Sequence, residues 1–211
     1  MADIISEIIT RRGCRLVLLQ GGGRIRVPTP LFRLFPLNPG EAIDLSAYQG
    51  KISGVEKRHA LEQAARLLES RDRSREELYS RLLECGYSAQ ASEEACDRLT
   101  AAGYLDDGRY AAALVRRLGR QYGEIRQRQV LRRKGIAQEM IEAVLATGDA
   151  EEQLAAAVRL AEKALKNKAG EPAALYRRAY FVLARRGFPP DMVRKALALA
   201  NSDHQAGTED A

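Results

Sequence analysis

Residues 103–135 read GYLDDGRYAAALVRRLGRQYGEIRQRQVLRRKG, and the rest of the chain is best interpreted outward from this stretch. It opens with a turn at 103–107, continues through two short runs with helical spacing, and ends on Gly135. Between positions 109 and 134 a single acid, Glu124, accompanies nine basic residues: Arg109, Arg116, Arg117, Arg120, Arg126, Arg128, Arg132, Arg133 and Lys134. No other stretch of this length in the sequence has so large a net charge.

The apolar residues of the first run fall on one side of a helix. On a helix over 110–120, the spacings i, i+1, i+4, i+5 and i+8 form one stripe of Tyr110, Ala111, Leu114, Val115 and Leu118. The arginines of this run fall on the other side. A second helix over 124–134 buries Val130 and Leu131 in a similar way. Ile125 does not fit this helix, and we expect it to pack against a neighbouring helix near the turn.

The two helices would expose arginine on their outer faces. Arginine holds a planar fork of donors that suits phosphate or carboxylate, which favours a binding surface for a polyanion or for an acidic protein groove. The alternative is a solvated helix face, although a solvated face tends to mix charge signs. The candidate binding residues are the nine basic residues above together with two from a later helix, Arg185 and Arg186.

Composition restricts the class of protein. The chain has 211 residues, of which 45% are hydrophobic and 29% charged, as in a soluble globular protein of one or two domains. Its net charge of +6 favours anionic partners. The three cysteines have the spacing of neither a zinc site nor a disulfide framework, so reduced thiols in the cytoplasm are expected. The sequence shows no secretory signal and no run of membrane-spanning length.

Residues 1–54 differ from the rest and predict a small β-containing segment. Residues 15–20 and 24–27 have strand patterns on either side of a triple glycine, which predicts a β-hairpin. The glycines are interpreted as a turn rather than a phosphate loop, because no GxxxxGKS or GxxxxGKT motif is present. Prolines keep residues 28–40 irregular apart from one helical turn at 31–35.

From about residue 55 the sequence is helical and repetitive. A leucine, a glycine four residues later and a bulky residue directly after the glycine recur three times: Leu82, Gly86 and Tyr87; Leu131, Gly135 and Ile136; Leu183, Gly187 and Phe188. Such a glycine suits the left-handed end of a helix. We therefore predict a mainly α protein of tandem three-helix repeats at 55–104, 105–148 and 149–200, stacked into an elongated, curved body, with a disordered tail at 201–211.

Four segments resemble the RecX family of recombination regulators: SREEL at 74–78, LLECGY at 82–87, GYLDDGRYA at 103–111 and RRKGI at 132–136. The resemblance covers about residues 57–200, and LDDGRYA is its most specific part. It implies tandem three-helix repeats that bind along the helical groove of the RecA–DNA filament. It also implies inhibition of the ATPase, strand-exchange and co-protease activities of RecA, and promotion of filament disassembly.

One position departs from the repeat pattern. Ser92 stands where the other two repeats have Ile141 and Val193, which is expected to loosen the core of the first repeat.

The remaining candidate residues favour structural roles. Asp106 and Asp107 could form a metal or catalytic pair, but adjacent acids at a helix start more often accept hydrogen bonds from its free amides. No Ser/His/Asp or Cys/His set with a supporting motif is visible, so we expect no catalytic site, metal or cofactor. Tyr104 and Tyr110 are expected in the core, whereas Tyr122 is kept open as a residue that stacks on bases.

The sequence thus predicts a non-enzymatic, cytoplasmic and monomeric regulator. Its middle repeat, helped by Arg185 and Arg186, would present arginine to a RecA filament. The arginines could contact acidic residues of the recombinase, the phosphates of single- or double-stranded DNA, or both. Two alternatives stay open: a stand-alone DNA-binding protein of helical repeats, and a nuclease that uses Asp106 and Asp107.

Overall fold

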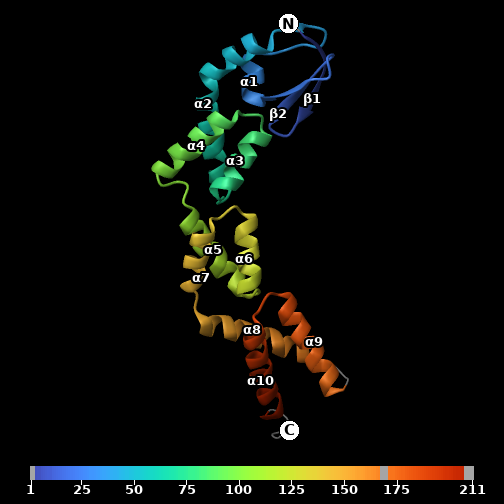
Figure 1. Cartoon of the computed structure of the whole chain (residues 1–211), viewed down its shortest axis with the longest axis vertical. Helices are drawn as coiled ribbons and strands as arrows, with labels where there is room; N and C mark the ends of the chain where they lie inside the picture. Colours follow the sequence, from blue (N-terminus) through green and yellow to red (C-terminus); the bar gives the residue numbers. More distant parts are fainter. Residues whose placement is uncertain (1–2, 167–170, 207–211) are drawn as a thin grey trace. The chain divides into compact units, whose positions relative to one another are not determined.

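The computed structural model describes residues 3–166 and 171–206, and the chain divides into two compact units between Asp107 and Gly108. The first unit contains β1 Asp3–Arg11, β2 Cys14–Leu19, β3 Arg24–Pro28, α1 Thr29–Leu34, β4 Ala42–Ile43, α2 Leu45–Ser70, α3 Arg75–Glu84 and α4 Ala89–Ala101 (Figure 1). The second contains α5 Asp107–Gly119, α6 Glu124–Arg133, α7 Gln138–Ala146, α8 Ala150–Leu165, α9 Pro172–Arg185 and α10 Pro190–Ala206. The predicted mainly α fold with an N-terminal β segment is confirmed. Within the described residues, no helix has the length and apolar character needed to cross a membrane.

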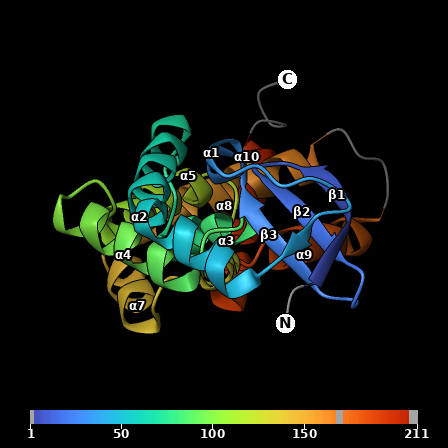
Figure 2. The same ribbon diagram turned by 90° about the horizontal axis from the view of Figure 1, so that it is seen from above.

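The N-terminal sheet is antiparallel and has the strand order β3–β2–β1–β4. Figure 2 shows β1, β2 and β3 side by side. The predicted hairpin is confirmed, because β2 and β3 pair on either side of the triple glycine. In that turn the Leu19 amide donates to the Gly23 carbonyl oxygen at 2.9 Å, so the glycines form a turn as expected.

Strand β1 lies inside the sheet, between β2 and β4, and the sequence analysis did not anticipate it. Its run DIISEIITR is rich in isoleucine, which favours strands, but apolar and polar residues do not alternate strictly. The register against β2 shifts between Ile5 and Glu7, which is a β-bulge. The bulge disturbs the two-residue period, and this explains why a search for alternation misses the strand.

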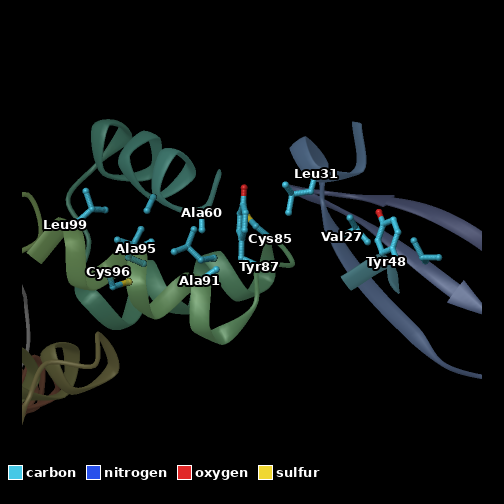
Figure 3. Packing of buried hydrophobic residues seen from close by; sticks show 14 of the residues in the cluster. Val27, Leu31, Tyr48, Ala60, Cys85, Tyr87, Ala91, Ala95, Cys96 and Leu99 are labelled. Carbon is cyan, nitrogen blue, oxygen red and sulfur yellow. The ribbon is translucent and has the colours of Figure 1, made fainter. Parts of the chain in front are cut away.

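The sheet and the first three-helix repeat share one hydrophobic core, so residues 1–54 do not form the separate segment that was predicted. Ile5, Val17 and Leu31 belong to the same buried cluster as Leu78 and Leu82. Figure 3 shows part of this cluster, with residues contributed by strands and by helices. The repeat therefore packs its apolar side on the sheet.

Helix α2 crosses the predicted boundary between the N-terminal segment and the first repeat, because it begins at Leu45 rather than near residue 55. Asp44 caps it, and its carboxylate accepts from an amide of the first turn at 3.1 Å. Tyr48 is buried, and its hydroxyl donates at 2.9 Å to a carbonyl oxygen of the loop after α1. The cap and this packing overcome the low helix propensity of Gly50 and Gly54.

The three repeats end their second helices, α3, α6 and α9, in the same turn. Gly86, Gly135 and Gly187 have φ angles of +91°, +73° and +81°. In each turn the amide of the bulky residue donates to the carbonyl oxygen of the leucine, at 3.2 Å for Tyr87 to Leu82, 3.2 Å for Ile136 to Leu131 and 3.3 Å for Phe188 to Leu183. All six of these residues are buried. The predicted left-handed glycine turn is therefore confirmed in all three repeats.

Helix α10 continues to Ala206, so the prediction of a disordered tail is wrong for residues 201–206. No proline or glycine occurs between Pro190 and Gly207, so the backbone contains no helix breaker in this interval. The remainder of the predicted tail, residues 207–211, lies outside the described residues.

Candidate polyanion-binding surface

Helix α5 has the predicted amphipathic pattern. Ala111, Leu114 and Val115 are buried, and Tyr110 and Leu118 pack against them from the edge of the stripe. The three arginines of this helix, Arg109, Arg116 and Arg117, all lie on its exposed side, and Arg120, which directly follows the helix, is exposed as well. Burial of the stripe therefore fixes which side of α5 the arginines occupy.

Helix α6 buries a narrow side around Leu131, with Val130 partly buried beside it. Gln127 is fully buried as well, and its side-chain nitrogen donates to the Tyr122 carbonyl oxygen at 2.8 Å. The sequence analysis missed Gln127 because it is polar. Its position four residues before Leu131 could have placed it on the buried side.

Arg128 connects α6 to α7 and is not an available binding residue. Its guanidinium lies 2.6 Å from a carboxylate oxygen of Glu124 and 2.9 Å from one of Glu142. The pKa of Arg128 is raised, most by its hydrogen bonds to Glu142 and next by its hydrogen bond to Glu124. The hydrogen bonding between Arg128 and Glu142 also lowers the pKa of Glu142. We therefore assign Arg128 to the packing of the second repeat.

The N-terminus of α6 docks on the Gly187 turn of the third repeat, and this joint places Arg186 beside the second repeat. The amides of Gly123 and Ile125 donate to the carbonyl oxygens of Arg186 and Gly187 at 3.0 and 3.1 Å. The Arg186 guanidinium donates to the Gln121 carbonyl oxygen at 3.2 Å. Ile125 is 44% exposed, and its amide makes the contact with the Gly187 turn, so the predicted packing of its side chain against a neighbouring helix is not established.

Glycine is required on both sides of this joint. A Cβ atom on Gly123 would clash with the carbonyl oxygen of Gly187. A Cβ atom on Gly187 would lie 2.5 Å from the amide nitrogen of Arg126. The free amides at the start of α6 thus find acceptors at the carbonyl end of α9, where the helix dipoles also favour the contact.

A groove of about 860 Å³ lies between α5, α7 and α8. Arg116 of α5 and Arg120, which follows α5, line it together with Arg159 of α8, which the sequence analysis did not select. Asp149 and Glu152 line the same groove. The groove therefore mixes charge signs, and Arg116 belongs both to its lining and to the exposed side of α5.

Five of the candidate residues are exposed and have neither a hydrogen bond nor an ion pair with any residue that the structure describes: Arg116, Arg117, Arg120, Arg133 and Arg185. Arg126 and Arg132 donate to the amide oxygens of Gln129 and Gln138, at 3.3 and 2.9 Å. Arg109 and Lys134 each have an interaction within the chain. The predicted set thus divides into five available arginines and six residues with contacts inside the protein.

Asp107, the first residue of α5, has a different contact from the one expected of the acid pair, and Asp106 has an interaction of its own within the chain. A carboxylate oxygen of Asp107 accepts from the backbone amide of Arg75 at 2.8 Å, so it serves the start of α3 rather than its own helix. Burial raises the pKa of Asp107, although the Arg75 amide opposes this shift. Within residues 3–166 and 171–206, no three His, Cys, Asp or Glu residues group together as a metal site would require.

Of the tyrosines near the arginines, Tyr104 lies in a different environment from the one predicted. Tyr104 is 70% exposed, so its assignment to the core is wrong. Tyr110 and Tyr122 are half-buried, and Tyr110 packs against the core of the second repeat. The turn before α5 ends without burying the ring of Tyr104, because Leu105 occupies the core position instead.

Comparison with known proteins now identifies the repeats. Residues 60–99, 106–145 and 151–197 match the first, second and third three-helix domains of RecX. The chain is 38% identical over 148 residues to the regulatory protein RecX of Halorhodospira halophila, which covers 68% of this chain and 89% of that protein. The chain belongs to the RecX family. Members of this family are regulators rather than enzymes, which argues against the nuclease alternative.

Further RecX proteins extend the comparison. Regulatory protein RecX of Thermus thermophilus is 37% identical over 144 residues, covering 68% of this chain and 94% of that protein. The RecX of Geobacillus kaustophilus is 33% identical over 178 residues, covering 83% of this chain and 66% of that protein. A crystal structure of RecX from Lactobacillus salivarius superposes with a TM-score of 0.66 at 20% identity, over 70% of this chain and 98% of that chain. This last likeness supports the fold alone.

Proposed function

We propose that this RecX-family protein binds the RecA–DNA filament through the basic outer side of its second repeat and inhibits RecA. The activities affected would be the ATPase, strand exchange and co-protease function. The observation that supports the proposal most is the set of five exposed arginines, four in the second repeat and Arg185 at the end of α9, that have no partner among the described residues. A folded protein gains little from such unpaired charges, whereas a polyanionic partner would use them.

The chemistry of these arginines suits two kinds of acceptor on such a filament. The guanidinium fork bonds in bidentate fashion to a carboxylate of the recombinase or to a phosphate of the DNA. Phosphate contacts release counterions, so each neutralised phosphate would add roughly 0.7–0.9 to the slope of log affinity against log salt concentration. A flat salt titration would therefore exclude the phosphate version.

The contacts that the remaining basic residues make inside the protein decide what each could contribute to binding. Arg126 and Arg132 donate to neutral glutamine amides, and a charged acceptor on the filament would replace those weaker bonds. Arg185 and Arg186 end α9, and the joint with α6 places Arg186 beside the second repeat. Arg128 is excluded because two carboxylates already occupy it.

The experiment is a titration of the protein into the DNA-dependent ATPase of the RecA from the same cell. A variant with Arg116, Arg117, Arg120 and Arg133 changed to alanine removes four exposed charges. We expect its half-inhibition concentration to rise by at least about a hundredfold, since a hydrogen bond to a charged group contributes roughly 1.5–3 kcal/mol.

The first unit offers a matched control. Replacing Arg11, Arg12, Arg24 and Arg33 by alanine also removes four exposed arginines and changes the net charge equally. This variant should inhibit like the wild type. Equal loss in both variants would attribute inhibition to overall charge, and unchanged inhibition by the first variant would contradict the proposal.

The same surface supports a second candidate, a stand-alone DNA-binding protein of helical repeats. The observation in its favour is that phosphates alone would satisfy the five arginines, with no recombinase present. A gel shift comparing naked DNA with RecA-coated DNA separates the two functions, because only the filament regulator should prefer the coated DNA. The proposal further includes a monomer in the cytoplasm that works without a cofactor. Sedimentation of the purified protein would check its oligomeric state.

A further inference from the structure

The exposed side of α9 carries aromatic rings among arginines and no acid. Four basic residues and no aspartate or glutamate occur between positions 172 and 186: Arg177, Arg178, Arg185 and Arg186. Phe181 is 62% exposed and Tyr176 is 45% exposed. A single exposed apolar residue is ordinary, and Tyr176 lies five residues before Phe181, about 140° away around the helix, so the two rings do not form one patch. The surroundings of Phe181 therefore decide whether its exposure has a functional explanation.

Phe181 lies among three arginines. Arg177 precedes it by four residues, Arg178 precedes it by three and Arg185 follows it by four, so all three are its neighbours on adjacent helical turns. Each of these arginines is exposed, and none has a hydrogen bond or ion pair with a residue that the structure describes. Ala184, the remaining neighbour, is exposed and small, so it leaves the approach to the ring open.

The Phe181 ring is anchored on the third repeat. It contacts the Tyr180 ring with a centroid distance of 6.1 Å and perpendicular planes. Tyr180 itself packs against the buried cluster of α8, α9 and α10. The perpendicular contact leaves both faces of the Phe181 ring clear of the Tyr180 ring, and most of the residue stays exposed.

The repeat fold does not require an aromatic residue at this position. Two residues before the buried leucine of the second helix, the third repeat has Phe181, the second has Gln129 and the first has Ser80. Both polar counterparts are compatible with the same turn and the same core. The ring at Phe181 is therefore not explained by folding.

We infer that this side of α9 binds a single strand of nucleic acid, with an unpaired base stacked on Phe181 and phosphates bonded to Arg177, Arg178 and Arg185. Aromatic stacking combined with arginine is the general chemistry of single-strand binding, and a base inside a duplex has no free face to offer. A protein partner would be expected to cover a wider apolar area, whereas Phe181 has arginines on both sides along the helix. The inference shares Arg185 with the proposed function and goes beyond it by assigning an unpaired base to Phe181 and phosphates to Arg177 and Arg178 of α9.

The chain has no tryptophan, so Phe181→Trp introduces a single fluorescent ring at the proposed site. The probe is oligothymidylate, and the matched ligand is an abasic strand of equal length that has the same phosphates without bases. We expect oligothymidylate to quench the fluorescence and the abasic strand to leave it unchanged.

Affinity gives the second readout. Phe181→Ala should weaken binding of the full chain to oligothymidylate by roughly five- to a hundredfold, the range for loss of one stacked base, and leave the affinity for the abasic strand unchanged. Tyr104→Ala, which removes another exposed ring, is the control and should bind like the wild type.

Three results would overturn the inference: absent quenching, equal wild-type affinity for the two strands, or a Phe181→Ala variant that loses RecA-filament binding while it keeps oligothymidylate binding. The last result would identify a protein as the partner of α9. Because the titrations contain no RecA, their failure is distinguishable from failure of the filament proposal.

Discussion

Helices α3 and α6 occupy the same place in consecutive repeats and carry opposite charges. Five residues before the buried leucine, α3 has Glu77 and α6 has Arg126. Two residues after that leucine, α3 has Glu84 and α6 has Arg133. Both helices end in the same left-handed glycine turn, so this turn forms with either charge in the helix before it.

The two helices also differ in what their charges do. Glu77 completes the capping box of α3 with Ser74, and Glu84 pairs with Arg81 at 2.7 Å. Arg133 of α6, in contrast, is exposed and has no such partner among the described residues. The leucine, the glycine and the bulky residue specify the repeat, and the exposed positions between them are available to specify a partner.

The largest effect is expected at the turn that the repeats share. Gly187→Ala combines a positive φ of +81° with a Cβ atom 2.5 Å from the Arg126 amide nitrogen. We expect a loss of roughly 3 kcal/mol in the free energy of unfolding, from backbone strain together with steric overlap. Chemical denaturation measures it.

Gly103→Ala is the matched control for this prediction. Gly103 has a φ of +76°, but a Cβ atom there would meet nothing within 4 Å. Only the strain remains, so a loss of about 1 kcal/mol is expected. Equal losses in the two variants would show that the joint between α6 and the Gly187 turn contributes nothing.

An intermediate effect on stability is expected at Ser92, where the other two repeats have Ile141 and Val193. Ser92 is fully buried, and its hydroxyl has no hydrogen-bond partner among the described residues. Ser92→Ala removes that unsatisfied group and should raise the free energy of unfolding by about 1 kcal/mol. Urea unfolding tests this, and a destabilised variant would reveal a partner for the hydroxyl and refute the account of this core.

The smallest effect on stability is expected at Arg128, the arginine of α6 that pairs with Glu124 and Glu142. Because the pKa of Glu142 is lowered below its ordinary 4.5 in the folded protein, the contribution of its bond to Arg128 is complete above that pH. The contribution is lost as the pH falls through the lowered pKa. Glu142→Gln should therefore lose less stability than the wild type between pH 5 and pH 3.

Glu139→Gln removes another exposed acid of α7 and serves as the control for the pH series. It should follow the wild-type pH dependence. Thermal unfolding across this pH range is the measurement, and identical curves for Glu142→Gln and the wild type would contradict the assignment of Arg128 to packing.

Local patterns predicted the repeats well because their determinants lie close together in the sequence. The leucine, glycine and bulky residue of each turn span six positions, and the capping box of α3 spans four. Strand β1 was not predicted because a bulge breaks the alternation of its apolar and polar residues. The start of α2 was not predicted because the packing of Tyr48 extends the helix through Gly50 and Gly54.

The sequence could not predict which arginines have partners inside the protein, because these partners come from tertiary contacts. Arg128 finds Glu142 on a different helix, and Arg186 finds the Gln121 carbonyl oxygen in another repeat. A count of charges along the sequence treats these residues and Arg133 alike. Only the fold separates the arginines that hold the repeats together from those that are available to a partner.

The most direct test of the account places acids on the exposed side of the second repeat, one of them at position 133, where α3 has Glu84. The variant Arg116→Glu, Arg133→Glu keeps the buried residues of α5 and α6, and its binding to RecA–DNA filaments is measured by co-sedimentation. Arg24→Glu, Arg33→Glu on the first unit is its control, with an equal change in charge. The account predicts at least roughly a hundredfold loss of affinity for the first variant alone, from two lost charged hydrogen bonds. Wild-type affinity in that variant, or an equal loss in the control, would contradict it.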